Sequence, residues 1–129
     1  MVEISVQTSG RTDFVDTTSK VQQAVGEMGV TDGAVVVYVP HTTAAITINE
    51  GADPAVVRDI DMELGKIVPF EDGYHHAEGN SAAHIKSSLV GCSEILAVNN
   101  GRLVLGTWQK IWFCEFDGPR RRRLVVQTL

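Results

Sequence analysis

Three segments of the chain carry histidines next to other polar side chains that could take part in chemistry. His41 follows Pro40 at the end of an apolar run, whereas His76 and His84 lie further along in polar sequence. Neutral imidazole is a common ligand of zinc, and a catalytic zinc site keeps three protein ligands and one open position. The spacing of these histidines matches no short metal motif. Spacing alone therefore leaves two readings open, a divalent metal site and ordinary polar residues.

Acidic residues occur in the same segments. Glu78 precedes Gly79-Asn80, where a helix is expected to begin. Its carboxylate could transfer a proton or support a metal ligand, or it could simply place favourable charge at a helix N-terminus. Asp53 precedes Pro54, which predicts an N-cap followed by proline in the first helical position.

Four consecutive arginines begin at Arg120, directly after Gly118-Pro119. One interpretation is an exposed strand in which alternate arginines point to opposite faces. The other is that the turn fixes Arg120 so that its planar guanidinium binds a phosphate or carboxylate group. The pattern assigns no function to residues 121–123.

Size and composition restrict the class of protein. The chain has 129 residues, of which 43% are hydrophobic and 21% charged, and this predicts one folded domain spanning residues 1–129. The net charge of −5 disfavours nucleic-acid partners. No segment is typical of a signal peptide or a membrane span, so we expect a cytoplasmic protein with no membrane partner. Two separated cysteines, Cys92 and Cys114, are expected to be buried, reduced thiols.

Hydrophobic periodicity predicts an α+β fold, a mainly antiparallel sheet with about three helices. The β-branched run 34–39 is typical of a strand that is buried on both faces. Asn100-Gly101 favours a type I′ hairpin, and the last three strands, joined by short connections, are expected to pair in sequence order. A helix beginning at Pro54 is expected to bury Val57, Ile60 and Leu64 and to end at Gly65. The expected strands are 2–7, 11–16, 34–39, 45–49, 94–99, 102–108, 109–116 and 124–128, and the other expected helices are 18–28 and 81–90.

Three motifs, taken together and in this order, resemble the YjbQ family, small proteins described as secondary thiamine-phosphate synthase enzymes. The first is PHTTAAITINE at 40–50, and the second is HAEGN at 76–80 with AHIKSSL at 83–89. The third is LGTWQ at 105–109 with EFDGPR at 115–120. The resemblance spans nearly the whole chain, and His75 lies outside the pattern.

The resemblance implies an α+β domain that assembles as a homotrimer, with a pocket near a subunit boundary. It implies that His41, His76 and His84 surround a divalent metal, zinc or magnesium. The family's activity joins a pyrimidine diphosphate to a thiazole phosphate and releases pyrophosphate. The remaining residues that the resemblance places at the site are Glu78, Asn80 and Arg120 as catalytic groups and Thr43, Lys86, Trp108 and Gln109 as substrate-binding groups.

We therefore expect a metal-assisted enzyme that acts on phosphorylated small molecules and has thiamine-phosphate synthase-like activity. In that interpretation Glu78 transfers a proton and Arg120 binds the phosphate group. The alternative is a non-catalytic trimeric module that binds a metal or an anion. A third possibility is a scaffolding trimer in which the histidines are merely buried polar groups.

Overall fold

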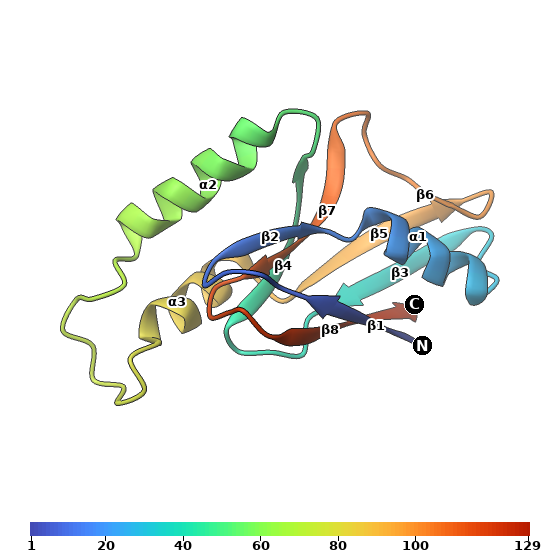
Figure 1. The fold of residues 1–129 in the computed structure, drawn as a ribbon. Helices are drawn as coiled ribbons and strands as arrows, with labels where there is room; N and C mark the ends of the chain where they lie inside the picture. Colours follow the sequence, from blue (N-terminus) through green and yellow to red (C-terminus); the bar gives the residue numbers. More distant parts are fainter.

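Two antiparallel sheets and three helices make up the computed structural model, which describes residues 1–129 (Figure 1). The five-stranded sheet has the order β1-β8-β3-β5-β6, and the three-stranded sheet has the order β2-β7-β4. The α+β class, the antiparallel pairing of the strands and the number of helices are therefore as predicted. The strands are β1 (Val2–Gln7), β2 (Asp13–Asp16), β3 (Gly33–Tyr38), β4 (Ala44–Glu50), β5 (Ser93–Asn99), β6 (Arg102–Leu103), β7 (Gln109–Glu115) and β8 (Arg121–Thr128).

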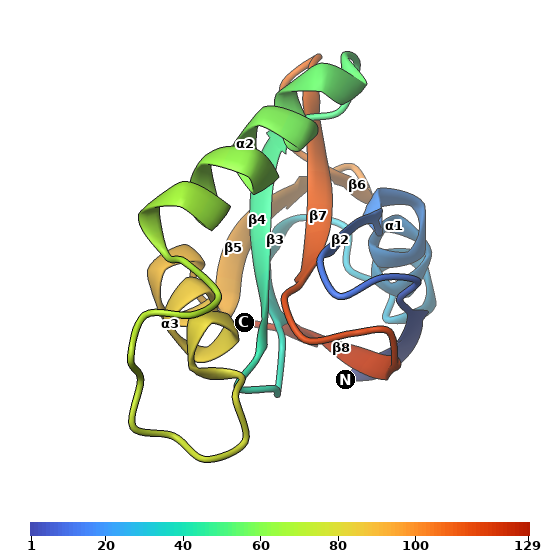
Figure 2. The same ribbon diagram turned by 60° about the vertical axis from the view of Figure 1, so that its left-hand side comes forward.

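The helices lie on two sides of the three-stranded sheet (Figure 2). Helix α1 (Thr18–Glu27) lies on one side, and α2 (Pro54–Ile67) and α3 (Ser81–Val90) lie on the other. The main core joins the inner faces of both sheets to the buried face of α1. A smaller cluster joins Ala83 of α3 to Ala45, Cys114 and Phe116 on the other face of the three-stranded sheet. None of the three helices is long and apolar enough to cross a membrane.

The prediction that the last three strands pair in sequence order is wrong, although the hairpin predicted at Asn100-Gly101 forms. Strand β5 pairs with β6, but β7 belongs to the other sheet and β8 lies between β1 and β3. Strand β6 has only two residues instead of the expected 102–108, because the chain leaves the sheet after Leu103 and crosses to the other sheet. Short connections favour neighbouring strands only where the chain stays within one sheet.

Burial differs from the prediction at three places. In β3 only Val35 and Val37 are fully buried, because one face of the five-stranded sheet has no covering layer within the chain. Helix α2 continues past Gly65 to Ile67 and has no fully buried residue, because its apolar side covers the sheet only partly. Cys114 is buried as expected, whereas Cys92 is exposed because it follows α3 at the surface.

The last strand begins at Arg121 rather than at Leu124, so three of the four arginines belong to β8. Their burial alternates, with Arg121 and Arg123 exposed and Arg122 buried. This is the period of two expected of a strand. It turns Arg122 toward the interior, on the same face as Leu124.

Candidate functional site

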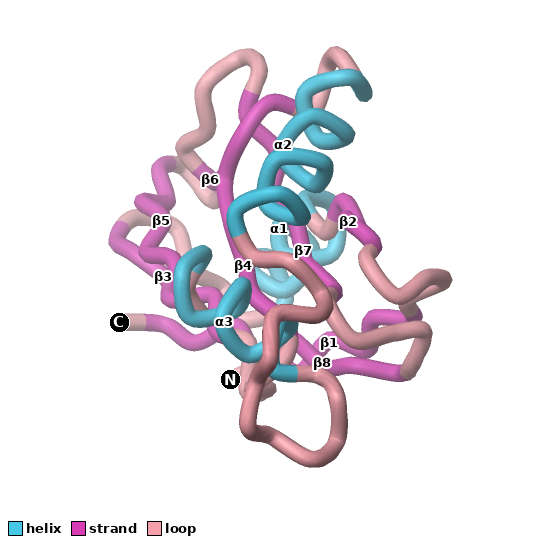
Figure 3. Tube along the Cα trace, turned by 90° about the vertical axis from the view of Figure 1, so that its left-hand side faces the viewer, coloured by secondary structure: helices cyan, strands magenta, loops and turns pink.

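The histidines are carried by two connections and one helix that meet at the same end of the molecule. His41 lies in the connection between β3 and β4, and Ser87 of α3 holds that connection by donating its hydroxyl to the Thr42 carbonyl at 2.6 Å. His76 lies in the connection from α2 to α3, a long loop that extends beyond the rest of the chain (Figure 3). His84 lies in the first turn of α3. Their meeting point therefore depends on the packing of α3 against β4.

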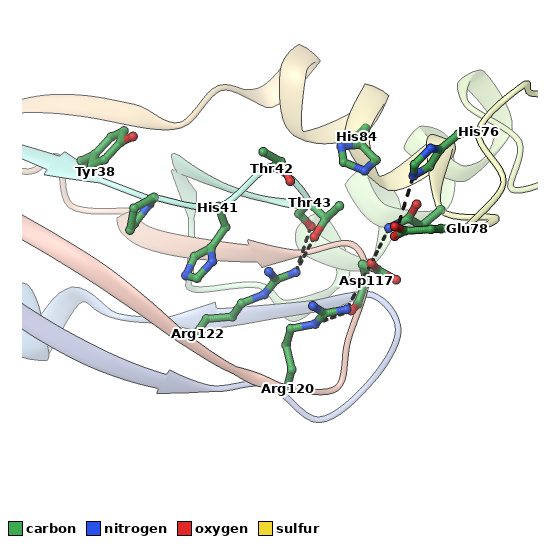
Figure 4. Close-up of a pocket in the computed structure, with 12 residues that line it drawn as sticks. Tyr38, His41, Thr42, Thr43, His76, Glu78, His84, Asp117, Arg120 and Arg122 are labelled. Atoms are coloured by element: carbon green, nitrogen blue, oxygen red, sulfur yellow. Dashed lines mark hydrogen bonds and ion pairs between the residues drawn. The ribbon is translucent and has the colours of Figure 1, made fainter.

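A polar cavity of about 680 Å³ opens at this place. Twelve residues line it, and only one of them is hydrophobic. Figure 4 shows the rings of His76 and His84 beside each other and near Glu78, with His41 and Arg122 standing apart from them. The wall combines imidazole, carboxylate, amide and guanidinium groups, which suits a charged, hydrophilic ligand.

His76 and His84 form a pair. Their ring centroids are 5.4 Å apart with the rings nearly perpendicular, and Nε2 of His76 lies 3.8 Å from Oε2 of Glu78. The side chains of His76 and Glu78 are 44% and 75% exposed, so both can turn without disturbing the core.

Asn80 joins the α2–α3 loop to the turn after β7. Its Nδ2 donates to Oδ2 of Asp117 at 2.9 Å, while its Oδ1 is buried and has no hydrogen-bond partner. A buried polar atom without a partner costs free energy, so a carbonyl oxygen left in this state beside a cavity favours a bound cation or donor. Asp117 also accepts from Nη2 of Arg120 at 3.2 Å, and Nε of Arg120 donates to the Asp117 carbonyl. The turn thus fixes Arg120 at the cavity wall.

A buried ion pair underlies the cavity. Arg122 is 5% exposed and donates through Nε and Nη2 to the fully buried carboxylate of Glu115. Nη2 of Arg122 also donates to the carbonyl and the hydroxyl of Thr43, and Glu115 accepts from the Thr8 hydroxyl and the Asp117 N–H. Burial raises the pKa of Glu115, but these hydrogen bonds outweigh burial and hold the pKa below its ordinary value.

His41 has a different environment from the other two histidines. Its Nε2 accepts a hydrogen bond from the backbone N–H of Arg123 at 3.0 Å. Burial, together with the positive charges of Arg122 and Arg123, lowers the pKa of His41 below 6.5. The ring is therefore neutral at pH 7.

Seven of the ten residues that the sequence placed at the site line this cavity. Lys86, Trp108 and Gln109 do not. Lys86 is buried with its Nζ 5.8 Å from the centre of the Phe116 ring, so it packs beneath α3. The residues that do line the cavity are His41, Thr43, His76, Glu78, Asn80, His84 and Arg120.

Trp108 and Gln109 stand at the far end of β7. The seven residues of β7 separate them from Glu115 by roughly 20 Å. Trp108 is 64% exposed, and Gln109 accepts a hydrogen bond from the Gly106 N–H within its own turn. Within one chain, Trp108 and Gln109 therefore lie too far from the histidines to contact a ligand that the histidines bind.

Sequence reasoning missed Arg122 and Asp117, both of which line the cavity. The signal for Arg122 was present, since alternate residues of a strand face opposite sides and Arg122 shares the parity of Leu124. No local signal marks Asp117, because only the partners that it binds across the fold, Asn80 and Arg120, reveal its position.

The donors present suit a divalent ion in kind. Imidazoles and carboxylates are zinc ligands, and the unpartnered Oδ1 of Asn80 adds a carbonyl oxygen. No three histidine, cysteine or carboxylate side chains are positioned together as a metal site, however. His41 departs from the expected set, because its Nε2 is already engaged by Arg123. His76, His84 and Glu78 could reach a common ion by turning the two exposed side chains.

Comparison with known proteins agrees with the fold. The chain is 50% identical to UPF0047 protein MJ1081 of Methanocaldococcus jannaschii, over 100% of this chain and 94% of that protein. It is 48% identical to UPF0047 protein YugU of Bacillus subtilis, over 98% and 96% of the two chains. A solved YjbQ/UPF0047 structure from Clostridium acetobutylicum matches with a TM-score of 0.97 at 53% identity, and covers all of both chains. The model of the family described as UPF0047 protein YjbQ-like matches residues 2–129, and the chain belongs to this family.

Proposed function

We propose that this protein is a metal-assisted enzyme acting on phosphorylated small molecules, with thiamine-phosphate synthase-like activity. The observation that carries the proposal is the cavity, which has an imidazole pair and an unpartnered amide oxygen in the same wall as guanidinium groups. A phosphorylated ligand needs positive charge around it, and a leaving pyrophosphate needs more as its negative charge develops.

The charges of the cavity explain why a cation is needed in addition to the arginines. Arg120 is paired with Asp117, and Arg122 is paired with Glu115. Glu78 adds another negative charge to the wall. The wall around the histidine pair, where Glu78 and Asp117 face Arg120, therefore offers no net positive charge to a pyrophosphate group. A divalent ion held by His76 and His84, near the unpartnered Oδ1 of Asn80, would stabilise the charge that develops on the departing phosphate oxygens.

The chain's own residues would position the ligand and transfer the proton. Arg120 is held by its own turn and presents the remaining face of its guanidinium to a phosphate oxygen. Oδ1 of Asn80 is free to accept a hydrogen bond from the ligand or to approach the ion. The thiazole nitrogen attacks with its lone pair and loses no proton, so Glu78, exposed at the mouth of the cavity, would act by donating a proton to the departing pyrophosphate.

The test is formation of thiamine phosphate from a pyrimidine diphosphate and a thiazole phosphate, with zinc or magnesium added. We expect product with the wild type and a loss of about 100-fold in rate for Glu78→Gln, the effect typical of losing a general acid. Glu71→Gln, in the same loop but outside the cavity, is the matched control. Equal rates for Glu78→Gln and wild type would remove Glu78 from the mechanism.

Metal content is measured in parallel on untagged protein. His84→Ala should lose stoichiometric zinc, while His75→Ala, whose imidazole lies outside the main cavity, should retain it. Zinc binding without any product in the wild type would favour the non-catalytic trimeric module that binds a metal or an anion. Absence of both would leave the scaffolding role.

A further inference from the structure

The hydrogen bond to His41 fixes which of its ring nitrogens carries the proton. A backbone N–H can only donate, so Nε2, which accepts from Arg123, has no hydrogen. An imidazole with a free lone pair on one nitrogen is the neutral form of the ring. The single ring proton therefore lies on Nδ1, which makes no hydrogen bond within the chain. His41 offers the cavity an N–H donor rather than the lone pair that a metal requires.

Arg122 also has an unused donor. Its Nε and Nη2 make four hydrogen bonds to Glu115 and Thr43, whereas Nη1 makes none. Nη1 is not fully buried, and Arg122 lines the cavity. The ion pair holds the guanidinium in one orientation before any ligand arrives. A preorganised donor loses little entropy on binding.

The surroundings of His41 and of the histidine pair differ in charge. A second hollow of about 310 Å³ shares His41 and Arg122 with the cavity and is also lined by Arg121, Arg123 and Glu3. Together with Glu115, the buried partner of Arg122, the His41 side has three positive and two negative groups. On the histidine-pair side, Glu78 and Asp117 face Arg120, which gives one positive and two negative groups. The first side favours an anion and the second favours a cation.

We propose that His41 and Arg122 form an oxyanion subsite that binds a phosphate or diphosphate group through Nδ1–H and Nη1–H, separate from the cation subsite at His76 and His84. The neighbouring backbone N–H groups of Thr42 and Thr43, which donate to no acceptor in the chain, supply further donors. The subsite depends on the proposed function only in that the ligand is phosphorylated. His41 is then a binding residue for the anion and not a metal ligand.

Binding of inorganic pyrophosphate is measured by calorimetry in EDTA, without divalent ions. His41→Phe keeps a ring but removes the Nδ1–H donor. Arg122→Lys keeps the positive charge that neutralises Glu115 but lacks the second terminal nitrogen of the guanidinium group. Each should weaken pyrophosphate binding about tenfold or more, the effect of losing a hydrogen bond to a charged group. His75→Phe and Arg102→Lys are the matched controls and should bind as the wild type does.

Nitrogen NMR of the His41 ring is measured on the wild-type protein, so its result does not depend on whether a variant folds. We expect the Nδ1–H tautomer, with its resonance moving on addition of pyrophosphate. An Nε2–H tautomer, or unchanged pyrophosphate affinity in both variants, would overturn the subsite. Pyrophosphate binding that requires added zinc and is lost in His84→Ala would also overturn it, yet leave the proposed function intact. Binding at His41 and Arg122 without thiamine-phosphate formation would support the subsite and refute the enzyme.

Discussion

Glu115→Gln should destabilise the protein strongly although it changes a single polar atom. The carboxylate is fully buried and accepts hydrogen bonds from both donating nitrogens of Arg122, from Thr8 and from the Asp117 N–H. Glutamine keeps the shape but leaves the Arg122 charge without a counter-charge, and its amide nitrogen faces donors instead of accepting from them. Removing one partner of a buried ion pair costs about 3–5 kcal/mol. For a domain of this size that corresponds to a fall in Tm of roughly 10–20 °C.

Urea unfolding followed by circular dichroism, at one fixed protein concentration, measures the change in unfolding free energy. The double variant Glu115→Gln/Arg122→Met removes both charges and should recover about half or more of the loss, because a buried pair replaced as a unit is often close to neutral. Glu63→Gln, whose carboxylate pairs with Lys66 at the surface of α2, is the control and should change stability by less than about 0.5 kcal/mol. A loss below about 1 kcal/mol for Glu115→Gln, or losses that simply add in the double variant, would refute the reasoning.

One further prediction concerns the pH dependence of the Glu115 ion pair, and two concern other parts of the structure. The folded-state pKa of Glu115 lies below its ordinary 4.5, so its stabilisation is complete above about pH 4.5 and is lost as the pH falls through the folded pKa; acid titration of stability should show this loss in the wild type but not in Glu115→Gln. Gly118→Ala should cost about 2 kcal/mol in urea unfolding, because a Cβ would overlap the Gly10 carbonyl oxygen, whereas Gly26→Ala, with open space around it, should not destabilise. Asp53→Ala should cost about 1 kcal/mol in the same assay by removing the bond from the Ala55 N–H that caps α2, and no change would contradict the cap.

Local sequence signals predicted the elements well. The helix α3 has the predicted bounds of 81–90, and Asp53 caps α2 with Pro54 in the first position. The strand β1 and the turn at Asn100-Gly101, where both residues adopt positive φ, also follow the sequence. These features depend on residues close together in the chain, so hydrophobic period, capping and turn chemistry were enough to predict them.

The pairing of strands that are distant in the sequence could not be predicted from such local signals. Nothing near Gln109 indicates that β7 leaves the first sheet to pair with β2 and β4, and this crossing carries Trp108 away from the histidines. Seven of the residues that the family motifs indicate line one cavity, but a motif does not define the direction of a side chain. The engaged Nε2 of His41 and the inward turn of Arg122 result from the register of β8, which the run of four arginines does not define.

The difference between the predicted and the observed burial of β3 bears on how the protein assembles. Its continuous apolar run is typical of a strand covered on both faces, yet within one chain Val36 is only half-buried and Ile95, directly opposite on β5, is 68% exposed. A second copy of the chain packed on this face would supply the missing cover and account for the run. The homotrimer that the family resemblance implies would satisfy that need, because each copy both offers and receives a surface. Ile95→Lys should then shift the mass measured by light scattering toward the monomer, whereas Glu94→Lys, its neighbour on the opposite face of β5, should not. A wild-type monomer with intact far-ultraviolet dichroism would show that the exposed valine and isoleucine of this sheet need no partner.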